Sequence, residues 1–253
     1  MLEARRPLVV IPTYQEAENI VVVLGRVRGV VPEASILVVD DGSPDGTADL
    51  AEASAGELGG VEVLRRPAKA GLGSAYRAGF AHGIARGHDV LIEMDADLSH
   101  DPADLPRLLA GIDGGADLVI GSRYVPGGAT PHWPLPRRLL SRWGNRYVGL
   151  VLGLRVRDAT AGFRAYRAEV LAMIDYQTTA ADGYAFQVEM AYRVRTSGGA
   201  IEEVPITFSD RVRGTSKMSG RIVVEAMLLV TWWGLRDRVL RRRSGRQAAQ
   251  RPG

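Results

Sequence analysis

The sequence of 253 residues has no cysteine and, among its 32 basic residues, only two lysines, Lys69 and Lys217. Without cysteine the chain can form no disulfide, no thiolate metal site and no cysteine nucleophile, which fits the reducing cytoplasm. Long apolar runs are also missing, because none reaches the roughly 18 residues of a membrane-spanning helix. The apolar run near the N-terminus is too short for a signal peptide. We therefore expect a cytoplasmic protein without a transmembrane span.

The formal net charge of +3 is unevenly distributed along the chain. From Arg236 onward there are seven arginines and one aspartate, a local charge of +6, so residues 1–235 carry −3. A body with a net negative charge lacks the extended basic surface that binding to nucleic acid requires. We expect no nucleic-acid partner, and the basic C-terminal segment is a separate feature.

Short apolar, β-branched runs alternate with segments of helical length over the first 120 residues. Because the runs are continuous rather than alternating, they are typical of strands buried on both faces. Strand–helix repetition predicts right-handed crossovers and a mostly parallel α/β sheet flanked by helices. No repeat or low-complexity linker divides the chain, so we predict a single domain. The predicted strands cover residues 7–12, 35–41, 61–66, 89–95 and 117–122.

Ligands of parallel sheets bind beyond the carboxyl ends of the strands, and polar residues gather there in this sequence. The segment "DAD" (Asp95 to Asp97) follows the apolar run "VLIEM". Two carboxylates this close repel each other, but together they suit a hard divalent cation such as Mg²⁺ or Mn²⁺. The alternative is a solvated turn with an incidental acidic pair. We interpret His100 as a neighbour of the site and Asp101, before Pro102, as the start of the next helix.

Two glycine-containing segments also follow predicted strands. In "VVDDGSPDGT" (Val38 to Thr47) the Asp41 carboxylate can accept hydrogen bonds from a nucleotide base. A tight turn with an N-cap is the alternative, but it leaves the adjacent Asp40 and Asp41 unexplained. The segment "GLGSAYRAG" (Gly71 to Gly79) has Tyr76 where a dinucleotide loop needs its third glycine. We interpret it as a close-approach turn that leads into a helix.

Basic residues accumulate after the predicted strands and in the later loops. Singly, each is an ordinary surface residue, but forked guanidinium groups placed together bind anions. An acidic cation site and basic pockets in one cleft indicate an enzyme that handles phosphates on both sides of a bond. The residues are Arg123, Arg137 and Arg138 with Ser141, followed by Arg211, Arg213 and Lys217.

Taken in order, these segments resemble those of dolichol-phosphate (polyprenol-phosphate) mannose synthases, which are inverting GT-A enzymes of glycosyltransferase family 2. The resemblance covers about residues 7–220 and rests on an ordered set of motifs. The motifs are "PTYQEAENI", "DDGSPDGT", "GLGSAYRAG", "DADLSHDP", "GSRYVPGG", "GFRAYR" and "DRVRGTSK". It implies a GT-A fold and transfer of mannose from GDP-mannose to the phosphate of a polyprenyl phosphate, with Mg²⁺ or Mn²⁺ as cofactor.

The resemblance also implies a role for each matching residue. The guanosine site would be lined by Pro12, Tyr14, Glu16, Val39 and Asp41. The diphosphate and the metal would face Asp95, Ala96 and Asp97, with Ser99 as a third candidate metal ligand. The acceptor phosphate would be held, or the charge at the diphosphate offset, by Arg123, Arg137, Ser141 and Arg211. The donor would be contacted by Lys217. Of these, the catalytic residues would be Asp95, Asp97, Arg123 and Arg211.

The chemistry of such a transfer agrees with the residues present. A phosphate monoester is already ionised near neutral pH, so it needs no strong general base to act as a nucleophile. The sequence contains no serine–histidine pair and no cysteine that would supply an activated nucleophile of its own. Positioning and stabilisation of the leaving diphosphate are what the reaction requires.

The C-terminal segment differs from family members that carry transmembrane helices. Residues 222–235 are apolar except for Glu225 and Thr231, and Trp232 and Trp233 stand beside the arginine cluster. Tryptophans next to arginines are typical of a membrane interface. We predict a catalytic domain over residues 1–220 and an amphipathic helix with a basic tail over 221–253. The tail would make peripheral contact with the cytoplasmic face of a membrane, aided by a membrane-protein partner. A core-packing helix with a solvated tail is the alternative.

Three other functions are compatible with parts of the sequence. A polyprenyl-phosphate glucosyltransferase using UDP-glucose would have the same fold. A phosphatase with an Asp-x-Asp nucleophile is a different class, although that motif would belong after the first strand rather than the fourth. A non-catalytic nucleotide-sugar sensor would bind the donor without transferring the sugar.

Overall fold

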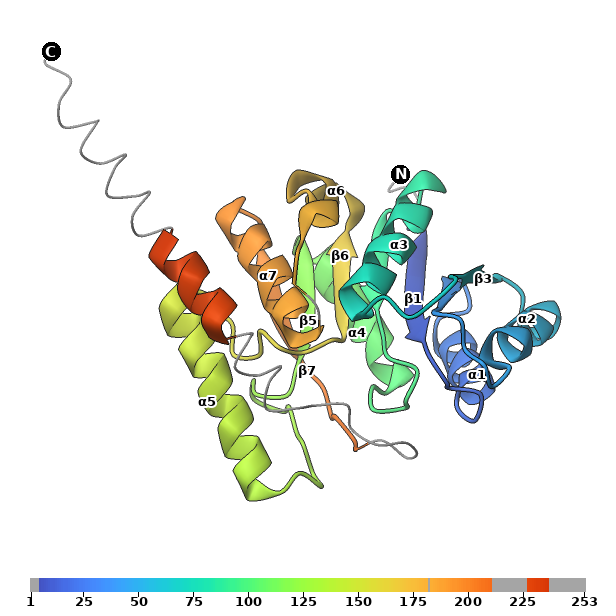
Figure 1. The fold of residues 1–253 in the computed structure, drawn as a ribbon, viewed down its shortest axis with the longest axis horizontal. Coiled ribbons are helices and arrows are strands. Elements are labelled where there is room, and N and C mark those ends of the chain that lie inside the picture. Colours follow the sequence, from blue (N-terminus) through green and yellow to red (C-terminus); the bar gives the residue numbers. More distant parts are fainter. Residues whose placement is uncertain (1–4, 182, 211–226, 237–253) are drawn as a thin grey trace, which may run out of the picture.

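The structure is a computed structural model that describes residues 5–181, 183–210 and 227–236 (Figure 1). Its centre is a seven-stranded sheet in the order β3-β2-β1-β4-β6-β5-β7. The strands are β1 (Pro7–Thr13), β2 (Ser35–Asp40), β3 (Val61–Arg65), β4 (Val90–Glu93), β5 (Leu118–Ser122), β6 (Arg164–Arg167) and β7 (Ile201–Pro205). The helices are α1 (Ile20–Val30), α2 (Thr47–Leu58), α3 (Leu72–Ala85), α4 (Leu105–Asp113), α5 (Leu135–Leu152), α6 (Ala168–Met173) and α7 (Gly183–Thr196). Two 3-10 turns are η1 (Pro102–Asp104) and η2 (Tyr176–Thr178).

The sheet is mostly parallel, as the alternation of strands and helices predicts. Strand β1 pairs in parallel with β2 and β4, and the pairs β2–β3 and β5–β7 are parallel too. Strand β6 is the exception, since it lies antiparallel between β4 and β5. The five strands predicted over the first 122 residues are all present, each within two residues of its predicted ends.

Helices cover both faces of the sheet and form two apolar cores. On one face α1, α2 and α4 pack against the sheet through residues such as Leu24 and Leu108. On the other face α3, α6 and α7 pack through residues such as Phe80 and Phe186. The continuous apolar strands are therefore buried on both sides, which is the physical reason for their composition.

Helix α3 approaches the sheet closely because of its glycines. A Cβ atom at Gly83 would lie 2.6 Å from Cδ2 of Leu8 and 2.6 Å from Cδ1 of Leu91, and one at Gly79 would collide with Val10. The helix begins directly after Gly71, whose φ of +92° is readily adopted only by glycine. The predicted turn that leads into a helix is confirmed, and the close approach to the sheet is made by glycines of the helix itself.

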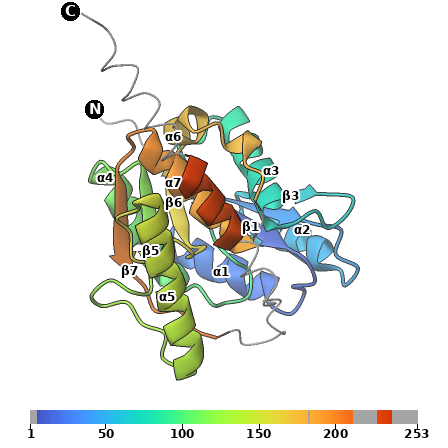
Figure 2. The same ribbon diagram turned by 60° about the vertical axis from the view of Figure 1, so that its left-hand side comes forward.

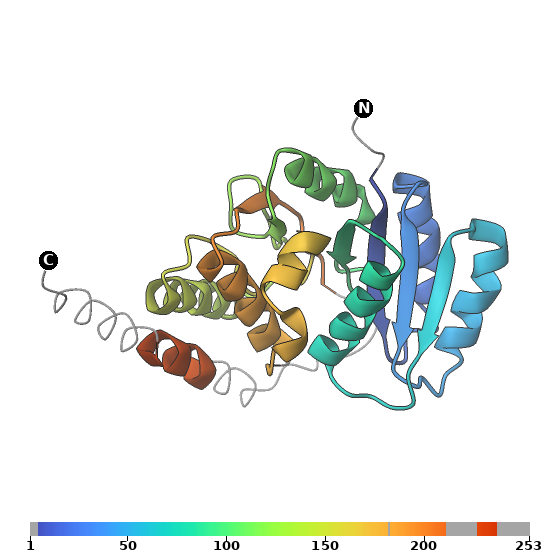
Figure 3. The same cartoon turned by 90° about the horizontal axis from the view of Figure 1, so that it is seen from above.

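A third core joins parts of the chain that are far apart in sequence. Residues 227–236 form a helix that lies along α5 and α7 (Figure 2). Its Val230 and Trp233 are buried, and Trp233 stacks on Tyr192 of α7 at a centroid distance of 6.4 Å. Figure 3 shows α5 and this helix on the side of the molecule away from α1 and α2.

Two predictions about the C-terminal part concern residues that the structure leaves undescribed. The predicted domain boundary at residue 220 and the basic tail beyond residue 236 lie outside the described residues. Within the described ranges, no helix combines the length and the apolar content needed to cross a bilayer.

Candidate active site

A cleft of about 450 Å³ opens at the carboxyl ends of β1, β2 and β4. Polar residues that follow different strands meet there, as parallel topology predicts. The cleft also receives residues from the loops after β5 and β7 and from the start of α7. It brings together nine of the predicted site residues: Pro12, Tyr14, Glu16, Asp41, Asp95, Ala96, Asp97, Arg123 and Arg137.

The loop after β1 is held in place by the "DGSPDGT" segment. The successive backbone N–H groups of residues 15–17 donate to the side chains of Ser43, Thr47 and Asp45 at 3.0, 3.0 and 3.2 Å. Burial would raise the pKa of Asp45, but hydrogen bonds from Thr47 and Ala17 outweigh it and lower the pKa. Gly46, which precedes α2, makes no side-chain cap, but Oδ1 of Asp45 accepts the backbone N–H of Thr47 at 3.2 Å. The same polar groups therefore hold both the neighbouring loop and the start of α2.

Asp40 and Asp41 have separate partners, which explains the adjacent pair. Asp40 accepts hydrogen bonds from the hydroxyl of Thr13 at 2.9 Å and from the backbone and hydroxyl of Ser43. Asp41 lines the cleft, where its Oδ1 lies 2.9 Å from Nη1 of Arg66 and its Oδ2 accepts from the backbone N–H of Ala70. The Asp41 carboxylate, which the sequence predicts to contact a nucleotide base, therefore has its charge offset by an arginine.

Asp95 and Asp97 lie in the floor of the same cleft. Asp97 is 4% exposed, and its Oδ1 accepts the backbone N–H of Ser99 at 3.0 Å. The hydroxyl of Tyr76 donates to Oδ1 of Asp95 at 3.3 Å. Burial, together with the charge of Asp95, raises the pKa of Tyr76 well above its usual value, so the phenol stays protonated and remains a donor. These contacts orient both carboxylates, which line the cleft.

His100 is a buried neighbour of the acidic pair. Its Nδ1 accepts the backbone N–H of Asp95 at 3.3 Å, and its ring stacks on Phe163 at a centroid distance of 5.0 Å. Burial lowers the pKa of His100 to about 4, so the imidazole is neutral near pH 7. Asp101 caps η1 by accepting the backbone N–H of Ala103, which confirms its predicted role.

Arg123 is buried at the junction between the cleft and a second cavity. Its Nε and Nη2 donate to the two carboxylate oxygens of Asp158 at 2.7 and 2.6 Å. Burial alone would raise the pKa of Asp158, but the guanidinium group outweighs it and holds that pKa below its usual range. The ring of Trp133 lies 5.3 Å from the guanidinium carbon. This bidentate pair fixes the arginine rigidly.

Arg137 stands at the same junction but is partly exposed. Its Nη1 lies 2.8 Å from Asp210, and its guanidinium group lies 4.0 Å from the ring centroid of Trp133. One turn further along α5, Ser141 accepts the hydroxyl hydrogen of Tyr124 at 2.7 Å. Basic and hydroxyl groups therefore mark the end of the cleft that adjoins α5.

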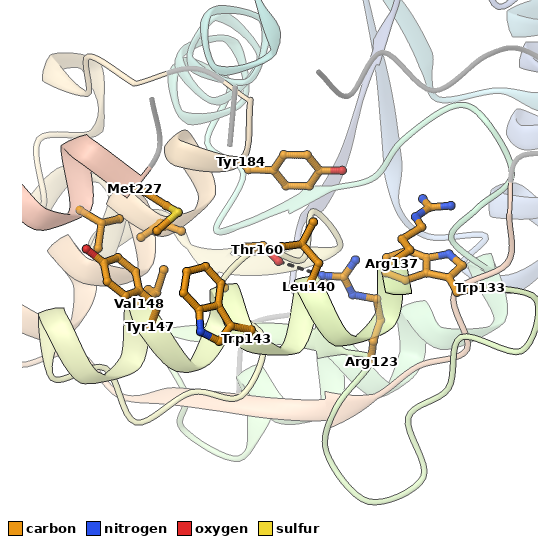
Figure 4. Close-up of a pocket in the computed structure, with 14 residues that line it drawn as sticks. Arg123, Trp133, Arg137, Leu140, Trp143, Tyr147, Val148, Thr160, Tyr184 and Met227 are labelled. Atoms are coloured by element: carbon orange, nitrogen blue, oxygen red, sulfur yellow. Dashed lines mark hydrogen bonds between the residues drawn. The ribbon is translucent and has the colours of Figure 1, made fainter. Parts of the chain in front are cut away.

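The second cavity is an apolar groove of about 120 Å³ between α5, α7 and the helix 227–236 (Figure 4). It shares Arg123, Trp133, Arg137, Thr160 and Tyr184 with the cleft. Its remaining walls are Leu140, Ser141, Trp143, Gly144, Tyr147, Val148, Val188, Met227 and Val230. An apolar groove thus leads directly away from the basic end of a polar cleft.

A family model for glycosyl transferase family 2 matches residues 8–174 of this sequence, which is more than half of the chain. The chain belongs to glycosyl transferase family 2. It is therefore an enzyme that transfers a sugar, and the predicted resemblance is confirmed at the level of the family.

Curated relatives and solved structures agree with this assignment. The polyprenol monophosphomannose synthase of Mycolicibacterium smegmatis is 52% identical over 240 residues, covering 94% of this chain and 91% of the relative. The undecaprenyl-phosphate mannosyltransferase of Micrococcus luteus is 54% identical over 233 residues, covering 92% and 96%. Glucosyl-3-phosphoglycerate synthase from Mycobacterium tuberculosis, solved with Mn²⁺, UDP and glucosyl-3-phosphoglycerate, superposes with a TM-score of 0.64 at 21% identity, covering 90% and 80%. This likeness confirms the predicted GT-A fold.

The side chains of the cleft that could ligate a metal are compatible with a hard divalent cation. Among the described residues, no group of three or more histidine, aspartate or glutamate side chains could by itself hold a metal ion. The cleft nevertheless contains two carboxylates, of Asp95 and Asp97. Mg²⁺ and related ions bind through one or two carboxylates and complete their coordination with substrate phosphates and water. The oxygen-only pair therefore fits a cation that binds together with a nucleotide diphosphate.

Three predicted site residues within the described ranges are not in the lining of the cleft. Val39 is fully buried in the core beneath α3, and Ser99 is buried behind Asp97. Ser141 lines the apolar groove. Arg211 and Lys217 lie outside the described residues.

Several residues of the cleft were not predicted from sequence. Lys69 lies 4.5 Å from the ring centroid of Tyr14, and its rarity as one of two lysines was the only signal for it. Gln187 and Tyr184 enter the cleft from α7, where helical periodicity alone indicates a packing face. Trp133 comes from the Gly/Pro-rich loop before α5, in which a bulky aromatic residue is a usable signal.

Proposed function

We propose that this glycosyltransferase moves mannose from GDP-mannose to the phosphate of a polyprenyl phosphate, with inversion at the anomeric carbon and release of GDP. The observation that carries the proposal is the junction of two unlike cavities at Arg123 and Arg137. A polar cleft with two carboxylates suits a nucleotide sugar, and an apolar groove suits a lipid chain. The names of the two bacterial relatives support the same substrates.

On the donor side, Tyr14, Glu16 and Asp41 would contact the nucleoside, and Asp95 and Asp97 would lie at the diphosphate. We propose that the two aspartates hold Mg²⁺ or Mn²⁺ when the donor binds. When bound, the cation would offset the negative charge of the leaving diphosphate. Lys69, which lies next to Tyr14 in the cleft, would add a positive charge on the donor side.

On the acceptor side, Arg123 and Arg137 would hold the phosphate and Ser141 would lie beside it. The first isoprene units would then extend along Trp143 and Tyr147 in the groove. Arg211 at the acceptor and Lys217 at the donor belong to the same proposal, from the motif that carries them.

The chemical step requires positioning rather than proton abstraction. A phosphate oxygen of the acceptor attacks the anomeric carbon while the bond from that carbon to the diphosphate oxygen breaks, and the configuration inverts. Because the acceptor is ionised near neutral pH, no proton has to be removed first. The rigid Arg123–Asp158 pair would keep the acceptor phosphate in line with the leaving group.

We further propose that residues 1–220 form the catalytic domain and residues 221–253 an amphipathic helix with a basic tail. The enzyme would act at the cytoplasmic face of the membrane as a peripheral protein, with a membrane-protein partner assisting. Its lipid acceptor supports this location, because a long polyprenyl chain resides in a bilayer.

The proposed function is tested by transfer of radiolabelled mannose from GDP-mannose to polyprenyl phosphate, with and without EDTA. We expect a labelled lipid product that EDTA abolishes and excess Mg²⁺ or Mn²⁺ restores. Product from UDP-glucose but not from GDP-mannose would assign the rival glucosyl transfer. Binding of GDP-mannose without any transfer would indicate a sensor, and release of phosphate from simple monoesters would indicate a phosphatase.

A further inference from the structure

Exposed apolar side chains gather on one side of the molecule. Thirteen large hydrophobic side chains are exposed among the described residues, and eight of them lie on α5 or on the helix 227–236. We call these eight residues the apolar face. They are Leu135, Leu139, Leu140, Trp143 and Leu150 of α5, with Leu228, Trp232 and Leu235 of the second helix.

The exposed residues of α5 form a continuous stripe. At 3.6 residues per turn, Leu135, Leu139, Trp143 and Leu150 fall within an arc of about 80° that runs for about 22 Å along the helix. The buried side of α5 contains Asn145 and faces away from this stripe. Leu150, which is 81% exposed, extends the stripe toward the end of the helix. Exposed apolar side chains that form a contiguous patch mark interaction sites.

The charges around the stripe indicate what covers it. Residues 123–157 contain seven arginines and no acidic residue. Arg138, Arg142 and Arg146 follow one another at four-residue spacing along the edge of the stripe, and none of the three forms a salt bridge within the described part of the chain. A second copy packed face to face would bring like charges together, whereas a surface of lipid with anionic headgroups complements both features.

The apolar groove links this surface to the reaction. It lies between α5 and the helix 227–236, with Trp143, Met227 and Val230 in its walls (Figure 4). Exposed tryptophans occur on both helices, Trp143 and Trp232, at 51% and 56% exposure. Amphipathic tryptophan rings are favoured at the boundary between headgroups and acyl chains. Trp143 therefore places such a ring in the wall of the groove, and Trp232 places another on the helix that encloses it.

We propose that the apolar face lies on an anionic lipid bilayer, with α5 parallel to its plane, so that a lipid acceptor enters the groove directly from the membrane. The acceptor part of this inference rests on the proposed function, but the docking of the face does not. The sequence alone indicated membrane contact only for residues 221–253. The structure assigns α5, which comes much earlier in the chain, to the same surface.

Docking can be measured on the full-length chain by co-sedimentation with vesicles of phosphatidylcholine and phosphatidylglycerol. We expect binding that weakens in vesicles of phosphatidylcholine alone, because the arginines then lack counter-charges. The double variant Leu139→Ser/Leu150→Ser should bind the mixed vesicles at least tenfold more weakly. Neither residue lines the cleft or the groove. The matched control Val22→Ser/Met173→Ser changes two exposed apolar residues on α1 and α6 and should bind as the wild type does.

A second measurement separates docking from catalysis. With a water-soluble short-chain prenyl phosphate, the double variant should transfer mannose as fast as the wild type, whereas transfer to a long-chain acceptor in vesicles should fall along with binding. Failure of the wild type to use the short-chain acceptor would count against the proposed function and leave the vesicle result standing.

Three results would overturn the docking proposal. The first is wild-type vesicle binding by Leu139→Ser/Leu150→Ser. The second is no binding of the wild type to pure lipid vesicles, which would assign the face to a membrane-protein partner. The third is a dimer of the wild type in sedimentation velocity that the double variant abolishes, which would assign the face to a second copy.

Discussion

At the scale of single residues, the acidic segment from Ile92 to Pro102 divides into separate functions. Asp95 and Asp97 face the cleft, whereas Asp101 caps a turn and His100 is neutral. Glu93, fully buried at the end of β4, accepts the side-chain amide of Gln187 at 2.7 Å. Burial raises the pKa of Glu93 to about 8, so this carboxyl group is largely protonated at neutral pH. The site therefore avoids a third negative charge beside the aspartates.

Replacing Asp97 by asparagine should abolish most of the transfer. An amide keeps the shape and the hydrogen bond from Ser99 but removes the charge that a cation needs, so we expect at least a 100-fold loss of activity with an unchanged circular dichroism spectrum. The matched variant Asp101→Asn alters only a cap and should retain activity. Near-normal transfer by Asp97→Asn would refute the role of this carboxylate.

The buried acid Glu93 should make the stability of the protein depend on pH. Its pKa is raised in the folded state, so its contribution is complete below about pH 4.5 and is lost as the pH rises to about 8. We expect Glu93→Gln to become more stable relative to the wild type between pH 5 and pH 8, by on the order of 4 kcal/mol. Urea unfolding at both pH values in the presence of EDTA measures this. A difference between the two proteins that does not change with pH would contradict it.

At the scale of elements, α3 shows how close packing places a side chain of the site. The glycines on its inner face allow the helix to approach β1 and β4, and Tyr76 on the same helix then reaches Asp95. A larger residue on that face would push the helix outward and move the phenol away from the carboxylate. Packing and orientation of the site thus depend on the same contacts.

The surroundings of two glycines predict that replacing each by alanine has opposite effects on the stability of the protein. Gly79→Ala would place a methyl group against Val10, and we expect a loss of about 1–3 kcal/mol of stability. Gly56→Ala on α2 meets no atom within 4 Å and should gain about 0.5–1 kcal/mol, because alanine favours the helix. Chemical denaturation of both variants checks the pair, and equal effects would show that helix propensity alone decides the outcome.

At the scale of the whole molecule, the groove exists because the third core packs together segments that are far apart in the sequence. Helix α5, α7 and the helix 227–236 enclose it, and the hydroxyl groups of Tyr147 and Thr231 are hydrogen-bonded at 2.5 Å across two of these helices. Asn145 of α5 donates to Ser141 and Thr160, which joins the same helix to the Arg123–Asp158 pair. The groove and the basic junction are therefore held by one continuous set of contacts.

Neighbouring tryptophans allow this long-range packing to be tested. Trp233 is 7% exposed and Trp232 is 56% exposed. We expect Trp233→Ala to cost about 3 kcal/mol of stability and to reduce transfer to long-chain acceptors, because one wall of the groove is released. Trp232→Ala should change stability by less than about 0.5 kcal/mol. Unfolding curves and calorimetric titration with GDP-mannose distinguish this from general damage, since donor binding should persist in both variants.

Local patterns in the sequence were enough to predict much of the fold. The period of the apolar runs indicated buried strands, and strand–helix alternation indicated a parallel sheet with polar residues at its carboxyl edge. Both depend on interactions within a few residues, as does the turn that Asp101 caps. Asp41, Asp95 and Asp97 were found for this reason, whereas Pro12, Tyr14 and Glu16 were assigned from the resemblance to the family.

Only the tertiary structure decided which residues from distant parts of the chain become partners. Asp41 is paired with Arg66, Arg123 with Asp158, and Asp95 with Tyr76. The antiparallel insertion of β6 and the apolar groove likewise depend on contacts between distant segments. A single sequence specifies which residue types can pair, but the choice of partner is made by packing, because burial strengthens one pairing and excludes the others.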